Sequence, residues 1–130
     1  MFTIDQIKEA HSKVKTGADF PSYVQNLIKL GVIHYSTHVE DGHTEYVGEN
    51  NYRVQSNSSY PTLNIAEKSE LEKFKDNLKN HQQGETDYFT FCRQSAALGV
   101  DKWIVDMIQM TCTYYDKIGD VMLVEEIPKP

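Results

Sequence analysis

Hydrophobic positions in the first 30 residues recur every three or four residues, which is the spacing of a helix that buries one face. Thr3 and Gln6 have the spacing of a capping box, so a first helix is predicted to begin there and to end before Gly17. Asp19 and Pro21 are typical of the cap and first turn of a second helix. The predicted apolar faces are Ile4, Ile7, His11 and Val14 in the first helix, and Phe20, Tyr23, Val24, Leu27 and Ile28 in the second.

After Gly31 the period of the pattern changes to two, as in a strand with one buried face. Asp41-Gly42 has the composition of a two-residue type I′ turn, which needs a positive φ at both positions. The chain then returns over "HTEYVG", turns at "ENN" and forms a third strand at "YRVQS". The alternation assigns Ile33, Tyr35, Thr37 and Val39 to the buried face, and His34, Ser36, His38 and Glu40 to the solvated face.

The second half of the chain shows the same succession of patterns. Ser69 and Glu72 predict a capping box, Gly84 ends the helix that follows, and Asp87 and Gly99 bound another helix. Strands are predicted at "KWIVDM", "MTCTYY" and "VMLVEEI". The apolar positions of these helices are Leu71, Phe74, Leu78 and His81, and then Tyr88, Phe91, Cys92, Ser95 and Ala96.

The segments "DFPSYVQNLIKLGV" and "DYFTFCRQSAALGV" begin at Asp19 and Asp87, which are 68 positions apart, and both end in Leu-Gly-Val. A small αα-βββ unit leaves an apolar face that a second copy can bury. The sequence therefore predicts an α+β fold of two tandem αα-βββ repeats packed as a single pseudo-symmetric domain, with repeat one at about 3–55, a linker at about 56–66 and repeat two at about 67–127. The residues expected to be largely buried are Tyr35, Trp103, Leu27, Ile28, Phe74, Leu78 and Phe91.

The composition fits one globular domain: the chain has 130 residues, of which 39% are hydrophobic and 25% charged. A net charge of −6 with scattered basic residues argues against binding to nucleic acid or to an anionic membrane. The N-terminus is charged from Asp5 onward and lacks the apolar core of a signal peptide. Cys92 and Cys112 have no zinc-binding spacing and suit a reducing compartment, so a cytoplasmic location is expected.

The predicted hairpin concentrates histidines and acids around its turn. A two-residue turn would set His38 opposite Glu45 and Glu40 opposite His43, all on the solvated face. These residue types bind zinc and other divalent ions, so His38, Glu40, His43 and Glu45 form a candidate metal site. The alternative is that they are ordinary charge pairs on a solvated strand pair.

Two comparisons favour the alternative. His34, expected to face Glu49, lies about 13 Å along the strand from His38, too far to share a metal with it. In the second half, the positions equivalent to His34 and His38 hold Lys102 and Asp106, so polarity is kept there but ligand chemistry is not. No tightly bound metal and no other cofactor is therefore predicted.

Other polar residues give weaker signals. His11 lies on the apolar face of its helix, where a satisfied core or interface histidine is expected. Nothing in the chain matches GxSxG, a phosphate-binding glycine loop or HExxH, so no catalytic residue is predicted and the chain is not expected to be an enzyme. Charges expected to be solvated on strands and turns are Asp116, Asp120, Glu125 and Glu126.

Several segments carry a resemblance to a known family: "FTIDQIKEAHSKVKTGADFPSYV", "DGHTEYVGEN", "HQQGETDYFTFC", "GVDKWIVDM" and "MTCTYYDKIG". They resemble a bacterial domain family of unknown function that is often labelled "phage envelope protein" and includes prophage-encoded members. The resemblance covers essentially the whole chain. It implies a small stand-alone bacterial α+β protein and assigns no activity and no catalytic residue.

Three hypotheses for the function follow. The first is a cytoplasmic binding module that holds a protein or a small ligand in a cleft between the two repeats. The second is a small metal-dependent enzyme or metal-binding protein that uses His38, Glu40, His43 and Glu45. The third, which follows from the resemblance alone, is a prophage accessory or structural protein. A homodimer is compatible with each of them.

Overall fold

The computed structural model describes residues 1–15 and 17–129. Over these residues the chain forms two helices and three strands, and then two further helices and three further strands. The helices are α1 (Ile4–His11), α2 (Phe20–Leu30), α3 (Leu71–Gln82) and α4 (Tyr88–Ala97), and the strands are β1 (Val32–His38), β2 (Thr44–Gly48), β3 (Arg53–Gln55), β4 (Val100–Asp106), β5 (Thr111–Asp116) and β6 (Val121–Glu126). Short 3₁₀ turns lie at Gly17–Asp19 and Glu49–Asn51.

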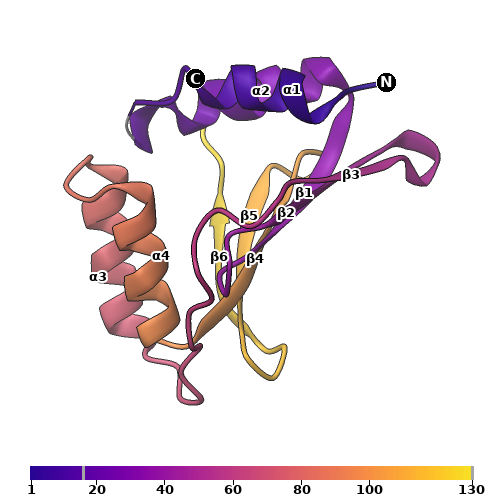
Figure 1. Cartoon of the computed structure of the whole chain (residues 1–130). Helices are drawn as coiled ribbons and strands as arrows, with labels where there is room; N and C mark the ends of the chain where they lie inside the picture. The colour runs from indigo at the N-terminus through magenta and orange to yellow at the C-terminus, as the bar shows by residue number, and fades with distance from the viewer. Residues whose placement is uncertain (16, 130) are drawn as a thin grey trace.

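All six strands join one antiparallel sheet in the order β3-β2-β1-β4-β5-β6. The centre of the sheet is the pair β1 and β4, whose register sets Tyr35 beside Val105 and Thr37 beside Trp103. Both helix pairs lie on the same side of the sheet, α1 and α2 over one end and α3 and α4 along it (Figure 1). We call the covered side the inner face. Helices packed on one face of an antiparallel sheet define an α+β fold, and this class is confirmed.

Two of the four predicted helix caps form as expected. Gln6 donates its backbone N–H to the Thr3 hydroxyl while its side chain accepts from the Thr3 N–H, which completes the capping box of α1. Asp87 accepts from the backbone N–H of Thr90 at 2.7 Å and caps α4. Asp19 occupies the N-cap position of α2, but the prediction that its side chain caps the helix is wrong, because its carboxylate accepts from the backbone N–H of Lys15.

The predicted capping box of Ser69 and Glu72 is also wrong. Helix α3 begins at Leu71 and has Glu70 at its N-cap position. The preceding backbone is held by the end of α4 instead, since Glu70 N–H donates to Leu98 O at 2.9 Å. Gly99, with φ at +90°, lies so close that an added Cβ would be 2.7 Å from Ser69 Cα. Tertiary contact therefore sets the direction of the chain at Ser69, and local capping does not.

The hairpin β1–β2 differs from the prediction in its register. Thr37 pairs with Thr44, and His38 N–H donates to His43 O at 3.0 Å, so the turn spans four residues, 39–42. Of Asp41 and Gly42, only Gly42 has a positive φ (+77°). The expected type I′ turn and the expected facing pairs are therefore wrong: Glu45 lies opposite Ser36, and His34 lies opposite Val47.

The physical reason lies in the two backbone groups that a two-residue turn would pair, the Glu40 carbonyl and the His43 N–H. The Glu40 carbonyl accepts from Leu63 N–H at 2.7 Å, and the His43 N–H donates to Asp41 Oδ1 at 3.0 Å. The segment after β3 and the side chain of Asp41 thus occupy the groups that the tighter turn would need. A bulge between Val32 and His34 also moves Val32 to a buried position and leaves Ile33 only half-buried.

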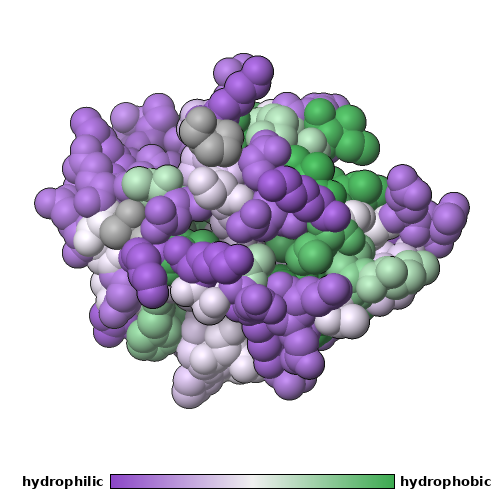
Figure 2. All heavy atoms as spheres, turned by 90° about the horizontal axis from the view of Figure 1, so that it is seen from above, coloured by the Kyte–Doolittle hydropathy of each residue, from purple (hydrophilic) through white to green (hydrophobic). Residues whose placement is uncertain are grey.

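Six of the seven predicted core residues are buried. The exception is Ile28, which is 37% exposed, because α2 buries a narrow stripe of Tyr23, Val24 and Leu27 and turns Ile28 past its edge. The surface seen from above is hydrophilic over most of its area, with hydrophobic atoms gathered on one side (Figure 2). No helix within the described residues is both long and apolar enough to cross a membrane.

Residues 56–70, which we call the strap, have no regular structure but are bound along their length. Ser59 N–H donates to Asp41 O at 2.8 Å, Leu63 N–H to Glu40 O at 2.7 Å and Ala66 N–H to Ala96 O at 2.9 Å. The strap therefore connects the tip of the β1–β2 hairpin to α4.

Candidate functional site

A cavity of about 740 Å³ lies between the two helix pairs and the inner face of the sheet. Its walls come from both halves of the chain, since both helix pairs and the sheet contribute lining residues. Aromatic side chains make up much of the lining: Tyr23, Tyr35, Tyr46, Tyr88, Trp103 and Tyr114.

The inner face of the sheet carries polar groups where an ordinary core carries aliphatic ones. Tyr35 and Tyr46 pair across β1 and β2, with ring centroids 5.4 Å apart. In the next row, Thr37 and Thr44 share a hydrogen bond of 2.9 Å between their hydroxyls. Both threonines are buried and line the cavity, so its wall offers donors and acceptors together with aromatic surface.

The phenols of this wall are neutral at physiological pH. Burial raises the pKa of Tyr35, Tyr88 and Tyr114 well above its usual value, and it also raises the pKa of Tyr23 and Tyr46. Each phenol therefore keeps its proton and can donate a hydrogen bond.

The two cysteines are poor nucleophiles. Burial raises the pKa of Cys112, which lines the cavity, to about 12, and it also raises the pKa of Cys92. The thiolate is the reactive form of cysteine, so a thiol held protonated in this way is inert.

Two histidines lie at the cavity. The ring of His81 stacks on Phe91 at 4.4 Å, and its Nδ1 lies 3.1 Å from both oxygens of Thr86. The ring of His11 meets Tyr23 edge-on at 5.3 Å, and the residue keeps access to solvent at the rim rather than lying in the core. Burial lowers the pKa of both rings, so they are neutral near pH 7.

Glu125 is a cavity residue that the sequence reasoning assigned to solvent. On β6 it lies directly opposite Cys112, on the inner face, and it accepts a hydrogen bond from Gln82 Nε2 at 3.1 Å. Burial raises the pKa of Glu125, and the bond from Gln82 offsets part of the effect. Alternation could have found it, because Leu123 and Ile127 occupy the same face of the strand. The neighbouring Glu126 is exposed, as predicted.

Of the two turn charges of the last hairpin, Asp120 is exposed, as predicted, and Asp116 is half-buried. Asp116 Oδ1 accepts from the backbone N–H groups of Ile118 and Asp120 at 3.2 and 2.8 Å. This carboxylate stabilises the turn between β5 and β6.

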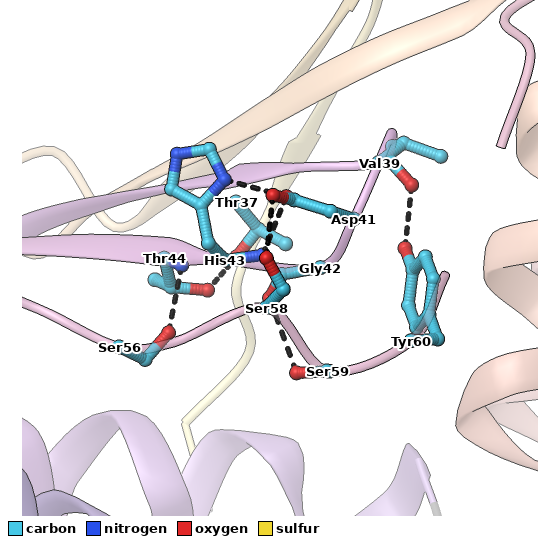
Figure 3. Close-up of polar contacts among 10 residues, drawn as sticks. All are labelled: Thr37, Val39, Asp41, Gly42, His43, Thr44, Ser56, Ser58, Ser59 and Tyr60. Carbon is cyan, nitrogen blue, oxygen red and sulfur yellow. Dashed lines mark hydrogen bonds and ion pairs between the residues drawn. The ribbon is translucent and has the colours of Figure 1, made fainter. Parts of the chain in front are cut away.

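The histidine-rich hairpin tip forms a closed set of hydrogen bonds (Figure 3). Asp41 Oδ1 accepts from the backbone N–H of His43 at 3.0 Å and lies 2.5 Å from its Nδ1, while Asp41 Oδ2 accepts from the Ser58 hydroxyl at 2.8 Å. Burial alone would raise the pKa of Asp41, but the bonds from His43 and Ser58 outweigh it and lower the pKa to about 2. Both oxygens of the Asp41 carboxylate are therefore occupied by hydrogen bonds within the protein.

The candidate metal residues are only partly brought together. The rings of His38 and His43 stack in parallel at 4.4 Å, and burial, followed by the neighbouring His43, lowers the pKa of His38. Glu45 lies opposite Ser36, and Glu40 is exposed in the turn. Within the described ranges, no group of three or more His, Cys, Asp or Glu side chains is arranged to hold a metal ion. That His38, Glu40, His43 and Glu45 bind no metal tightly stays a prediction to be tested.

Comparison with known proteins identifies a family but assigns no activity. The model of the family described as "Protein of unknown function (DUF1398)" matches residues 8–126. No curated protein matches the chain.

Proposed function

The chain belongs to the family described as "Protein of unknown function (DUF1398)", and since that description names no activity, we propose from the cavity that the protein binds a small organic ligand without acting on it chemically. The observation that carries this proposal is the wall of neutral phenols and hydroxyls around about 740 Å³ of space. Ligand sites of small molecules occupy about 300–1,000 Å³ and combine apolar surface with a few polar groups.

Stability alone gives no reason for such a wall. Burying a hydroxyl costs free energy unless it is hydrogen-bonded, and aliphatic side chains would fill a core at lower cost. Thr37 and Thr44 satisfy each other, but the cavity also exposes phenols such as Tyr35 and Tyr114 to one common space. A ligand with both apolar and polar atoms would use this surface.

The chemistry of the cavity favours binding over catalysis. Its thiol, Cys112, is held protonated, and its two histidines, His11 and His81, contact aromatic rings. A nucleophile needs a lowered pKa or an adjacent base. We therefore propose a binding module, acting in the cytoplasm as the acidic composition and the free cysteines favour.

We also propose that the frame of the cavity is a tandem duplication. Two observations support it: β1 and β4 have the same succession of buried and half-buried positions, and Gly31 and Gly99 both adopt a positive φ just before these strands. Superposing residues 4–55 on 71–127 tests the idea. If the helix ends at Gly31 and Gly99 do not coincide, the proposed duplication is wrong. A prophage role and a homodimer stay predictions.

Ligand binding can be tested with N-phenyl-1-naphthylamine, a neutral dye whose fluorescence increases in apolar surroundings. We expect saturable binding of one dye per chain. Val14→Trp should fill part of the cavity and weaken binding at least about tenfold, because Val14 lines it. The matched control is Lys13→Trp, at an exposed neighbour that does not line the cavity. Equal affinity in the two variants, or no saturable binding by the parent, would contradict the proposal.

A further inference from the structure

We propose that the ligand of this cavity is an amphipathic organic cation, with an apolar body held among the aromatic rings and an ammonium group paired with Glu125. This inference rests on the proposed binding function and names its ligand class. It starts from the position of one carboxylate on the inner face of the sheet.

Glu125 is half-buried among groups that do not neutralise it. Its register partner is Cys112, and Gln82 donates one neutral hydrogen bond to Oε1. The ion pairs found among the described residues involve the acids Asp41, Glu67, Glu70 and Glu72. Glu125 is in none of these pairs, although a carboxylate taken from water is stabilised most by a cation.

The charges around the cavity are mainly negative. Asp87 and Glu126, both exposed, line it together with the half-buried Glu125, and the lysine in the lining, Lys15, is exposed as well. His11 and His81 add no positive charge near pH 7, because burial lowers their pKa. A cleft lined by one sign of charge raises the local concentration of ligands of the opposite sign.

Aromatic side chains, among them Tyr114, Trp103 and Phe91, line the same cavity as Glu125. Tyr114 is two residues along β5 from Cys112, on the same face, and its ring lies 6.0 Å from that of Trp103 and 5.0 Å from that of Phe74. The ring of Phe91 follows at 5.8 Å from Trp103. A cation near such faces gains from the ring quadrupoles, and the apolar body of the ligand gains from their area.

The same arrangement disfavours other ligand classes. A neutral ligand that displaced water from the cavity would leave the Glu125 carboxylate less solvated and without a counter-charge, which costs free energy. An anionic ligand would add repulsion from Glu125 to this cost. The expected order of affinity is therefore cation, neutral molecule, anion.

Three compounds with one common body test this order: 4-phenylbutylamine, 4-phenylbutan-1-ol and 4-phenylbutanoate. Each is titrated by calorimetry and by displacement of N-phenyl-1-naphthylamine at pH 7.5. We expect the amine to bind at least about tenfold more tightly than the alcohol, and the acid to bind most weakly, as the strength of a charge-assisted hydrogen bond implies.

Two variants assign the effect to one carboxylate. Glu125→Gln should reduce the affinity for the amine to about that for the alcohol, roughly tenfold, and leave the affinity for the alcohol within about twofold. Glu85→Gln, the same change at an exposed residue outside the cavity lining, should change the affinity for the amine by less than about threefold. The dye reports in each variant that the cavity is intact.

The outcomes separate this inference from the binding function itself. If the three compounds bind alike, or if Glu125→Gln leaves the amine unaffected, the cation assignment is wrong while ligand binding stands. An effect of Glu85→Gln as large as that of Glu125→Gln would also overturn the pairing, because it would indicate that the general surface charge attracts the amine. If neither the dye nor any of the three compounds binds, the proposed function fails first.

Discussion

The tip of the β1–β2 hairpin and the inner face of β5–β6 each contain a carboxylate among polar neighbours, yet they differ in what those neighbours do. At the tip, Asp41 receives hydrogen bonds from His43 and Ser58. On the inner face, Glu125 accepts one bond from Gln82 and lies beside open space. The first carboxylate has a lowered pKa and the second a raised one. The comparison shows that closely spaced polar side chains can use up their hydrogen-bonding capacity on one another. A better candidate for a site is a charged side chain that has few partners and open space beside it.

The largest expected effect concerns the core under the cavity. Phe74 is fully buried against Phe91 and Tyr114, so Phe74→Ala should lower the free energy of unfolding by about 3–5 kcal/mol. Urea denaturation measures it. Phe89→Ala, at a side chain 42% exposed, is the control and should cost less than about 1 kcal/mol. Similar costs for both would mean that the inner face is loosely packed throughout, and the contrast with the hairpin tip would lose its basis.

The next effect concerns Asp41. Asp41→Ala should lower the free energy of unfolding by about 1.5–3 kcal/mol, toward the lower end because the side chain is partly exposed, since the bonds from His43 and Ser58 are lost. Binding of N-phenyl-1-naphthylamine should not change, because Asp41 is not in the cavity wall. Weakened dye binding at unchanged stability would mean that Asp41 serves ligand binding and not the fold, which is the reverse of the roles assigned to the hairpin tip and the inner face.

The same variant predicts a dependence on pH. The folded pKa of Asp41, about 2, is below its ordinary value of 3.8, so its stabilisation is present above the ordinary value and is lost as the pH falls toward 2. The difference in unfolding free energy between parent and Asp41→Ala should therefore shrink from about pH 5 downward. A difference that stays constant over this range would show that the ionised carboxylate is not what stabilises the turn.

A smaller effect of opposite sign is expected at Glu125. Burial raises its pKa, so the ionised form disfavours folding at neutral pH, and Glu125→Gln should leave the free energy of unfolding unchanged or raise it by less than about 1 kcal/mol. Thermal unfolding at pH 7 measures the change. A clear loss of stability would indicate that Glu125 serves the fold, as Asp41 does, and would remove the distinction between them.

The smallest expected effect is on metal binding at the tip. Zinc titration by calorimetry should give no micromolar binding that the double variant His38→Ala, His43→Ala abolishes. His43 Nδ1 is bonded to Asp41, and the described residues bring no third His, Cys, Asp or Glu side chain into a metal-binding arrangement with this pair. Micromolar binding lost in the double variant would make the hairpin the functional site.

The element order and most of the core could be predicted from local patterns, because capping, period and glycine positions act over a few residues. Thr3 and Asp87 are examples, because each caps its helix through a bond to a residue three positions along the chain. The register of the β1–β2 hairpin could not be predicted, since it depends on the bond from Leu63 N–H to the Glu40 carbonyl, and Leu63 is distant from Glu40 in the sequence.

The candidate site was hidden for a related reason. Residue type identifies chemistry, but it does not reveal which groups will find partners in the fold. The alternation of buried and exposed positions along β6 does assign Glu125 to the inner face. The signal was concealed because Glu125 is followed directly by the exposed Glu126. The space beside it exists only once both helix pairs have packed on the sheet.

The central pairing of β1 with β4 has a consequence for synthesis of the chain. His34 pairs with Asp106, 72 positions later, so on the ribosome β1 acquires its first neighbour, β2, well before its second one is made. During that interval the nascent chain exposes an unpaired strand edge, which is the kind of edge that other chains can join. Closing the sheet by so long a loop also slows folding. Production of this protein should therefore respond to translation rate and to chaperones more than its small size suggests.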